Sequence, residues 1–242
     1  MDLYPAIDLR GGRCVRLYQG DYGRETVYGD DPVAQALAFE AEGAAWIHVV
    51  DLDAARSGEP RNRSVVAAIA AAVAVPVQSG GGVRDDEAAA ALIEAGVSRV
   101  VLGTAALEDP GLVRRLAASM PVAVGLDARG RDVAVRGWEQ DSGRDLLDVA
   151  RSFADAGVAA LVVTEIGRDG TLEGPDLAGL AEVLASTTID VIASGGVGSL
   201  DDLRALDGLE IEGRRLAGAI VGRALYEGSF SLTEARSAVI GR

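Results

Sequence analysis

The chain carries the stretch Phe39-Glu-Ala-Glu-Gly-Ala-Ala-Trp-Ile-His-Val-Val-Asp51. A second copy with the same pattern follows in the other half of the chain, as Phe153-Ala-Asp-Ala-Gly-Val-Ala-Ala-Leu-Val-Val-Thr-Glu165. In each copy a helical segment ends at a glycine and an apolar run then ends in an acidic residue. At the same offset, Gly81-Gly82-Val83 is matched by Gly195-Gly196-Val197. The repeat predicts two fused halves with the same order of elements.

Short apolar runs alternate with helical stretches rich in Ala and Leu along the whole chain. The runs are continuously apolar, which is typical of parallel strands covered on both faces. We expect strands at residues 3–7, 46–50, 75–78, 100–102, 122–126, 160–164, 191–193 and 218–221. We expect helices at residues 33–42, 64–72, 86–95, 110–118, 143–155, 177–186 and 200–205.

Eight such units in 242 residues predict an α/β fold, a (β/α)8 TIM barrel with a two-fold internal half-barrel repeat. An open doubly wound sheet is the alternative, and it would not require eight units. No linker or change in composition separates the halves. We therefore expect a single barrel domain over residues 1–242, with half-barrels at about 1–120 and 121–242.

The rare residue types exclude several kinds of chemistry. All 23 basic residues are Arg, so a lysine Schiff base, a lysine-linked pyridoxal phosphate and a Walker-type phosphate loop are impossible. A single Cys and a single His exclude disulfides and zinc sites built from several such ligands. The catalytic groups that remain are mostly carboxylates, arginines and backbone amides.

Charge and hydropathy bear on partners and location. A net charge of −14 argues against a broad nucleic-acid surface, which needs a basic stripe. No apolar run reaches the ~18–20 residues of a membrane span. The first residues, Met-Asp-Leu-Tyr-Pro, show neither the basic nor the apolar region of a signal peptide. We expect a cytoplasmic protein.

Two aspartates end corresponding strands of the two halves. Asp8 follows the first strand and Asp127 the fifth. Because strand C-termini form the active face of such a barrel, these carboxylates should oppose each other across its mouth. A lone aspartate after a strand is more often a helix N-cap, but the repeated position favours a general acid and a general base acting on one molecule.

Glycines follow the third, fourth, seventh and eighth strands. They let backbone approach a phosphate closely, and helix N-terminal N–H groups bind its charge. The repeat pairs the third and fourth strands with the seventh and eighth, so we expect two phosphate cradles and a long bisphosphate ligand. The predicted phosphate-binding residues are Gly81, Gly82, Gly103, Thr104, Gly170, Gly195, Gly196, Gly222 and Arg223.

Other polar residues should complete this face. His48 lies inside the second strand, where a buried structural role and a ligand-binding role are equally compatible with the sequence. Trp138 lies in a polar loop, where stacking on a planar ligand is the natural role for it. The remaining candidates on this face are Arg16, Arg136, Thr164 and Asp169.

Motifs along essentially the whole chain resemble one family, the phosphoribosylformimino-5-aminoimidazole carboxamide ribotide isomerases of histidine biosynthesis. The motifs that carry the resemblance are Pro5-Ala-Ile-Asp8-Leu-Arg-Gly-Gly-Arg-Cys-Val-Arg16, His48-Val-Val-Asp51, Gly80-Gly-Gly-Val-Arg84, Val124-Gly-Leu-Asp127, Arg136-Gly-Trp138, Thr164-Glu-Ile-Gly-Arg-Asp169, Ala193-Ser-Gly-Gly196 and Ile220-Val-Gly-Arg223.

The resemblance implies an Amadori rearrangement of an aminoaldose to an aminoketose that needs no metal or cofactor. It implies that Asp8 is the base, Asp127 the acid, that Thr164 assists the acid, and that Trp138 stacks on the imidazole. It further implies that Arg16, His48, Arg136 and Asp169 bind a bisphosphorylated aminosugar. We expect a monomer.

Related enzymes offer alternatives. The cyclase subunit of imidazole glycerol phosphate synthase shares the barrel and both aspartates, but it carries Cys and Lys where this chain has Ile7 and Arg16. Actinobacterial enzymes that also isomerise phosphoribosylanthranilate usually carry Ser where this chain, like single-substrate isomerases, has Gly80. A non-catalytic phosphosugar-binding barrel is the alternative from another class, and in it both aspartates would be dispensable.

Overall fold

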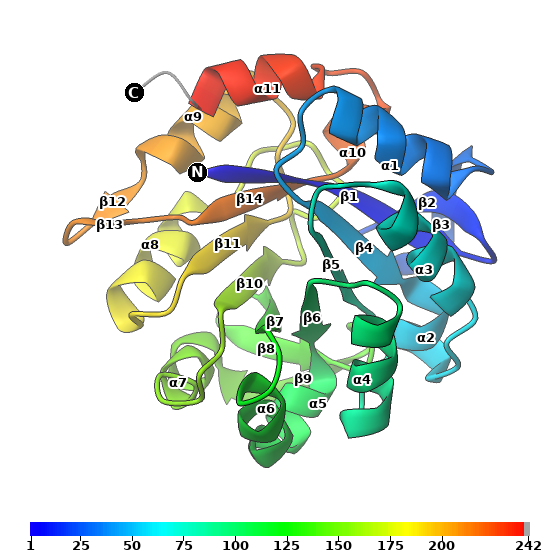
Figure 1. The fold of residues 1–242 in the computed structure, drawn as a ribbon. Coiled ribbons are helices and arrows are strands. Elements are labelled where there is room, and N and C mark those ends of the chain that lie inside the picture. The colour runs from blue at the N-terminus through cyan, green and yellow to red at the C-terminus, as the bar shows by residue number, and fades with distance from the viewer. Residues whose placement is uncertain (240–242) are drawn as a thin grey trace.

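Eight parallel strands form a closed ring in the computed structural model, which describes residues 1–239. Strand β1 pairs in parallel with both β4 and β14, and β7 pairs with β10, so the ring has no open edge (Figure 1). The predicted TIM barrel is confirmed, and the open doubly wound alternative is wrong. In ring order the strands are β1 (Asp2–Arg10), β4 (Ile47–Asp51), β5 (Val77–Gly80), β6 (Arg99–Leu102), β7 (Val122–Arg129), β10 (Ala160–Glu165), β11 (Val191–Ser194) and β14 (Gly218–Val221).

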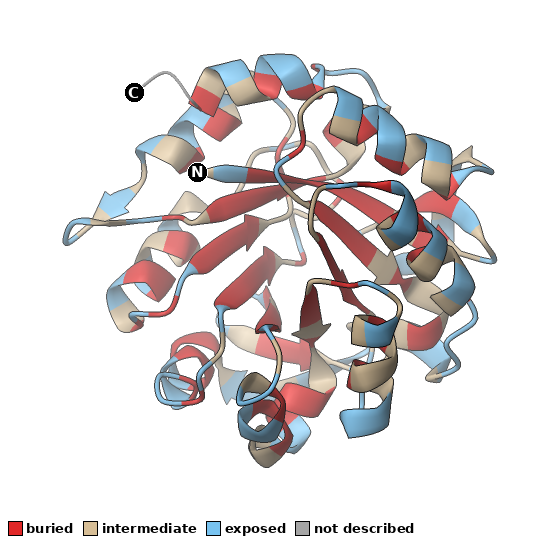
Figure 2. Ribbon diagram, viewed as in Figure 1, coloured by how far each residue is buried: buried red, intermediate tan, exposed pale blue. Residues whose placement is uncertain are grey.

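Helices surround the ring and turn their exposed faces outward (Figure 2). Most begin at a side-chain cap. For example, the hydroxyl of Ser199 and the carboxylate of Asp202 form a reciprocal capping box at α9. The longer helices are α1 (Pro32–Ala41), α3 (Arg63–Ala72), α4 (Asp86–Glu94), α6 (Pro110–Ala117), α7 (Leu146–Ser152), α8 (Leu177–Ser186), α9 (Leu200–Gly208) and α11 (Leu232–Val239). The shorter ones are α2 (Leu52–Ser57), α5 (Thr104–Glu108) and α10 (Arg223–Tyr226).

Several predicted boundaries differ from those of the structure by two or three residues, and two of these differences have a clear physical reason. The helix expected over 143–155 begins only at Leu146, because Asp145 caps it by accepting hydrogen bonds from the N–H groups of Leu147 and Asp148. The strand expected over 75–78 lies at Val77–Gly80, after Pro76, which has no N–H to contribute to a strand ladder.

Two antiparallel extensions were not predicted. Strands β2 (Arg13–Tyr18) and β3 (Asp21–Gly29) continue from β1, and β8 (Asp132–Val135) and β9 (Gln140–Asp145) continue from β7. They occur after the first strand of each half, as the internal repeat requires. A further short hairpin, β12 (Glu210–Ile211) with β13 (Arg214–Arg215), precedes β14.

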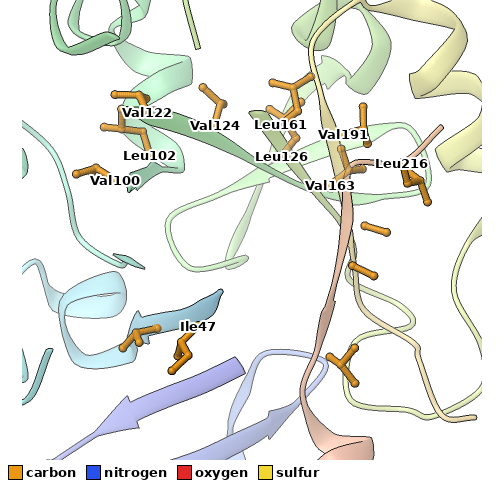
Figure 3. Packing of buried hydrophobic residues seen from close by; sticks show 14 of the residues in the cluster. Ile47, Val100, Leu102, Val122, Val124, Leu126, Leu161, Val163, Val191 and Leu216 are labelled. Carbon is orange, nitrogen blue, oxygen red and sulfur yellow. The ribbon is translucent and has the colours of Figure 1, made fainter. Parts of the chain in front are cut away.

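The side chains of the ring separate into two apolar layers by strict alternation. Outward-facing residues such as Val100, Leu126 and Leu161 pack under the helices, and Figure 3 shows part of this layer. Inward-facing residues include Ala6, Ala123 and Ala160, whose small side chains fill the barrel interior. The alternation therefore leaves only inward positions near the strand C-termini able to reach the mouth.

Within residues 1–239, no helix has both the length and the apolarity needed to cross a membrane.

We predict that Leu184→Ala, in α8, lowers the free energy of unfolding by about 2–5 kcal/mol, because the side chain is fully buried against the ring. The matched control is Leu37→Ala in α1, whose side chain is 42% exposed, and it should change stability by no more than about 0.5 kcal/mol. Urea unfolding of both variants checks this. Equal losses would contradict the assignment of the inner and outer helix faces.

Candidate active site

A cavity of about 700 Å³ opens at the C-terminal ends of the strands, and a smaller one adjoins it. Arg16, Asp169, Ser194 and Ile220 line both, so these residues form a shared wall of the two cavities. All the site residues predicted from the sequence line one or the other. The large cavity holds Asp8, His48, Gly81, Gly82, Gly103, Thr104, Asp127, Arg136, Trp138 and Thr164. The small one holds Gly170, Gly195, Gly196, Gly222 and Arg223.

Asp8 lies near the end of β1, in register with Val50 of β4. Its carboxylate Oδ2 is 2.9 Å from Nη1 of Arg16 in an ion pair that is largely buried. Burial raises the pKa of Asp8 to about 6, although Arg16 opposes the rise and Asp169 adds to it. At neutral pH most of this carboxyl is therefore ionised, but it is far more basic than an ordinary aspartate.

Asp127 occupies the corresponding position on β7 and is paired in register with Thr164 of β10. Burial raises the pKa of Asp127 above its ordinary value, while hydrogen bonds from the Thr164 and Trp138 side chains oppose the rise. Asp169 raises the pKa further through its negative charge. Among the residues that the structure describes, no arginine pairs with Asp127, so it lacks the positive partner that Asp8 has.

Arg16 has more donors than Asp8 uses. Its Nε is buried with no hydrogen-bond partner within residues 1–239, and its Nη1, although it is paired with Asp8 by charge, makes no well-aligned hydrogen bond there. The guanidinium lies against Gly222, where any Cβ would collide with it. Because Arg16 reaches both cavities, an anionic oxygen bound in either could satisfy these donors.

The first glycine pair forms the rim on the side of the N-terminal half. Gly81 has φ +101°, and a Cβ there would collide with the carbonyl oxygen of Asp51. The short helix α5 begins after Gly103, and no N-cap side chain bonds to its first N–H groups. The hydroxyl of Thr104 accepts a hydrogen bond of 2.7 Å from the N–H of Arg136, which ties the β8–β9 turn to this rim.

The second pair forms the opposite rim. Gly196 has φ +88°, and a Cβ there would collide with the carbonyl oxygen of Gly174. Helix α10 begins after Gly222, again with no side-chain cap. Arg223 donates from Nη1 to the carbonyl oxygen of Gly170 at 2.7 Å and from Nε to Glu227 at 3.2 Å, so it anchors the loop that follows β10.

Three loops meet over the mouth. The indole of Trp138 packs on Gly20, in the turn between β2 and β3, closely enough to exclude a Cβ. In the same turn, Gln19 donates from its backbone N–H to the carbonyl oxygen of Asp169 at 3.1 Å and from Nε2 to that of Gly167 at 2.7 Å. The turns from both hairpins and the β10–α8 loop thus form one cover over the large cavity.

Sequence reasoning missed two buried polar residues beside His48. Gln78 is fully buried, and its Nε2 lies 2.9 Å from Nδ1 of His48. Arg99 is also buried and bonds to Gln78. The available signal was two long polar side chains at the borders of apolar strands, but only the strand register shows that they meet. Among residues 1–239, no group of three or more His, Cys, Asp or Glu side chains is arranged to hold a metal ion.

Comparisons with known proteins agree on one family. Residues 2–231 match the family model described as "Histidine biosynthesis protein". A protein of Synechococcus elongatus is 52% identical over 241 residues, which cover 99% of this chain and 93% of that protein. A protein of Dinoroseobacter shibae is 53% identical over 237 residues, covering 97% and 98%. Both are named 1-(5-phosphoribosyl)-5-((5-phosphoribosylamino)methylideneamino) imidazole-4-carboxamide isomerase.

We predict that Asp127→Asn stabilises the protein at pH 8 more than at pH 4. The folded-state pKa of Asp127 is raised, so between the unfolded and the folded pKa the native state binds more protons than the unfolded state. Wild-type stability therefore falls as pH rises through this window, and the amide variant escapes that loss. Urea unfolding at both pH values measures the difference.

The control for this experiment is Asp145→Asn, because the pKa of Asp145 is lowered by its hydrogen bond with Arg131. Its favourable contribution exists above the unfolded pKa, so this variant should lose more stability at pH 8 than at pH 4. If both variants shift in the same direction, the electrostatic assignment of Asp127 is wrong.

Proposed function

The chain belongs to the histidine-biosynthesis protein family, and on this premise we propose that it is an aldose–ketose isomerase acting on 1-(5-phosphoribosyl)-5-((5-phosphoribosylamino)methylideneamino) imidazole-4-carboxamide. The observation that carries the proposal is the pair of buried carboxylates, Asp8 and Asp127, at matching strand ends around one cavity. A glycine-lined rim on either side supplies two places for phosphate groups.

The reaction moves protons without net oxidation. Asp127, as a carboxylic acid, gives a proton to the ribose ring oxygen; the bond from that oxygen to C1′ breaks and the adjacent nitrogen forms a protonated Schiff base. Asp8, as a carboxylate, takes the proton from C2′, and the electron pair left behind forms a C1′–C2′ double bond while the C–N double bond becomes single. Protonation at C1′ and loss of the hydroxyl proton at C2′ then give the aminoketose.

The environments of the two aspartates support this division of roles. The Arg16 cation beside Asp8 favours its ionised form, which a base requires. Burial without a neighbouring cation favours the protonated form of Asp127, which an acid requires, and Thr164 and Trp138 orient its oxygens. The protonated Schiff base is itself the electron sink, so this scheme uses no cofactor.

The positions of the side chains support the proposed ligand-binding roles. Arg16 and Asp169 line both cavities, and His48, Trp138 and Arg136 line the large one. One phosphate is held by the rim of Gly81, Gly82, Gly103 and Thr104. The other is held by the rim of Gly170, Gly195, Gly196, Gly222 and Arg223, in which Arg223 acts by anchoring the loop at Gly170.

We do not propose phosphoribosylanthranilate as a second substrate. The named relatives carry the imidazole-4-carboxamide isomerase name alone. At Gly80 a Cβ would lie 2.9 Å from the carbonyl oxygen of Val101, so a serine there would require β6 to shift.

The proposed working form is a monomer of one domain in the cytoplasm, with half-barrels at about 1–120 and 121–242. The proposed site residues line two adjoining cavities of one barrel, which supports a monomer. The net charge of −14 argues against nucleic-acid partners.

We predict that Asp8→Asn and Asp127→Asn each lower kcat/KM for the imidazole-carboxamide aminoaldose by about 10²–10⁴-fold, because each removes one proton-transfer group. Steady-state assays of the purified variants measure this. Asp155→Asn, at an exposed position near the opposite end of the barrel, is the control and should keep wild-type activity. Full activity in both site variants would instead support a non-catalytic phosphosugar-binding barrel.

A further inference from the structure

A chain of polar side chains runs through the barrel interior beneath the two aspartates. The strand register aligns His48 of β4 with Gln78 of β5, and Gln78 with Arg99 of β6. All three are buried, with Gln78 fully enclosed and the other two 8% exposed. The register also aligns Ala6 of β1 with His48, so the imidazole lies one inward layer below Asp8.

The bonds of Arg99 determine which way the Gln78 amide points. Arg99 donates from Nε to Oε1 of Gln78 at 2.9 Å and from Nη2 to the same oxygen. A guanidinium has donors and no acceptor, so the amide atom facing it must be the oxygen. The amide nitrogen is then the atom 2.9 Å from Nδ1 of His48.

The amide nitrogen in turn determines the state of the imidazole. An NH₂ group can only donate in this contact, so Nδ1 must carry a lone pair. A neutral ring with an unprotonated Nδ1 has its proton on Nε2. The bond at Nδ1 is the ring's one hydrogen bond within residues 1–239, and His48 lines the large cavity.

We infer that Gln78, held by Arg99, is a positioning residue that keeps His48 neutral with its Nε2–H directed to the cavity as a hydrogen-bond donor. The ligand it serves rests on the proposed function: an acceptor oxygen of the bisphosphorylated aminosugar. In this state His48 binds and orients the aminosugar but transfers no proton. The acid–base chemistry is then left to Asp8 and Asp127.

The support beneath Gln78 is rigid. The Arg99 guanidinium lies 4.4 Å from the centroid of the Trp46 ring and donates to the Tyr4 hydroxyl at 3.1 Å. The rings of Tyr4 and Trp46 stack with centroids 5.7 Å apart. The amide therefore cannot turn over without leaving a buried guanidinium short of acceptors.

The surrounding charges act in the same direction. The charged groups that influence the ring are Arg16, near the mouth, and Arg99, below it. Burial and these two cations lower the pKa of His48 to about 3. Protonation of Nδ1 would also place its N–H group against the N–H of the Gln78 amide.

The direct test is the ¹⁵N spectrum of the imidazole in the full-length protein labelled with ring-¹⁵N histidine. The chain contains one histidine, so a single ring is observed. We expect a pyridine-like Nδ1 and a pyrrole-like Nε2, unchanged from pH 8 down to pH 5. A protonated Nδ1, or titration of the ring within this range, would overturn the inference.

A variant isolates the contribution of Gln78. Gln78→Glu replaces the amide NH₂ by a carboxylate oxygen, so Nδ1 should become protonated, as the other tautomer or as imidazolium. In the Nδ1–H tautomer Nε2 has no proton to donate, so KM should rise about tenfold, the effect of one lost neutral hydrogen bond. An imidazolium would keep the Nε2–H and would show itself by its ionisation. The pH profile of kcat/KM should also gain an ionisation absent from wild type.

The control is Ser79→Ala, one residue further along β5, where the side chain points into the outer layer and its hydroxyl has no partner within residues 1–239. It should keep the wild-type spectrum and KM. A wild-type spectrum in folded Gln78→Glu would overturn the inference, and if that variant does not fold, the pH series on wild type decides alone. The expected wild-type spectrum without isomerase activity would refute the proposed function but not the positioning role.

Discussion

A closed ring of parallel strands directs every second side chain inward, and this parity decides which groups can meet at the mouth. Asp8 and Asp127 are both at inward positions near the ends of their strands, as their register with Val50 and Thr164 shows. A shift of either by one residue would place its carboxylate in the outer apolar layer, under the helices. The geometry of the site thus depends first on ring closure by β1 and β14 and on the register it imposes.

The two halves have the same order of elements, but the partners of their two aspartates differ. Each half has an Asp near the end of its first strand, an antiparallel extension, and a short helix without a side-chain cap after a glycine. Only Asp8 faces an arginine, whereas Asp127 is paired with neutral donors. A symmetric scaffold therefore surrounds its two carboxyl groups with different partners, which supports the proposed division into a base and an acid.

The barrel interior below the polar mouth has an apolar part and a polar part. The apolar part contains small and aliphatic side chains such as Ala123 and Ala160. The sector formed by β4, β5 and β6 instead contains a buried hydrogen-bonded chain ending at His48. A buried network of this kind fixes the orientation of a ligand-facing group more strictly than apolar packing can.

Local sequence patterns predicted the ring strands and the polar residues at their ends, because apolar runs and glycines are signals within a few residues. The extensions β2–β3 and β8–β9 were missed because β3 and β9 contain mostly polar, exposed residues such as those of 140–145, which lack the apolar pattern of a buried strand. The start of α7 was misplaced because Asp145 is equally compatible with a strand end and a helix cap. Gln78 and Arg99 were missed because their role depends on contacts between neighbouring strands. The register between two parallel strands cannot be predicted from the sequence of either strand alone.

Burial at the mouth makes Asp8 an unusually basic carboxylate, while its arginine partner keeps it ionised at neutral pH. The most direct measurement is a ¹³C titration of the side-chain carboxyl of Asp8 in the free protein, assigned by the signal that disappears in Asp8→Asn. We expect a midpoint near pH 6. A midpoint at the ordinary aspartate value near 3.8 would show that burial at the mouth does not raise the pKa of Asp8, and would contradict its role as an unusually basic carboxylate.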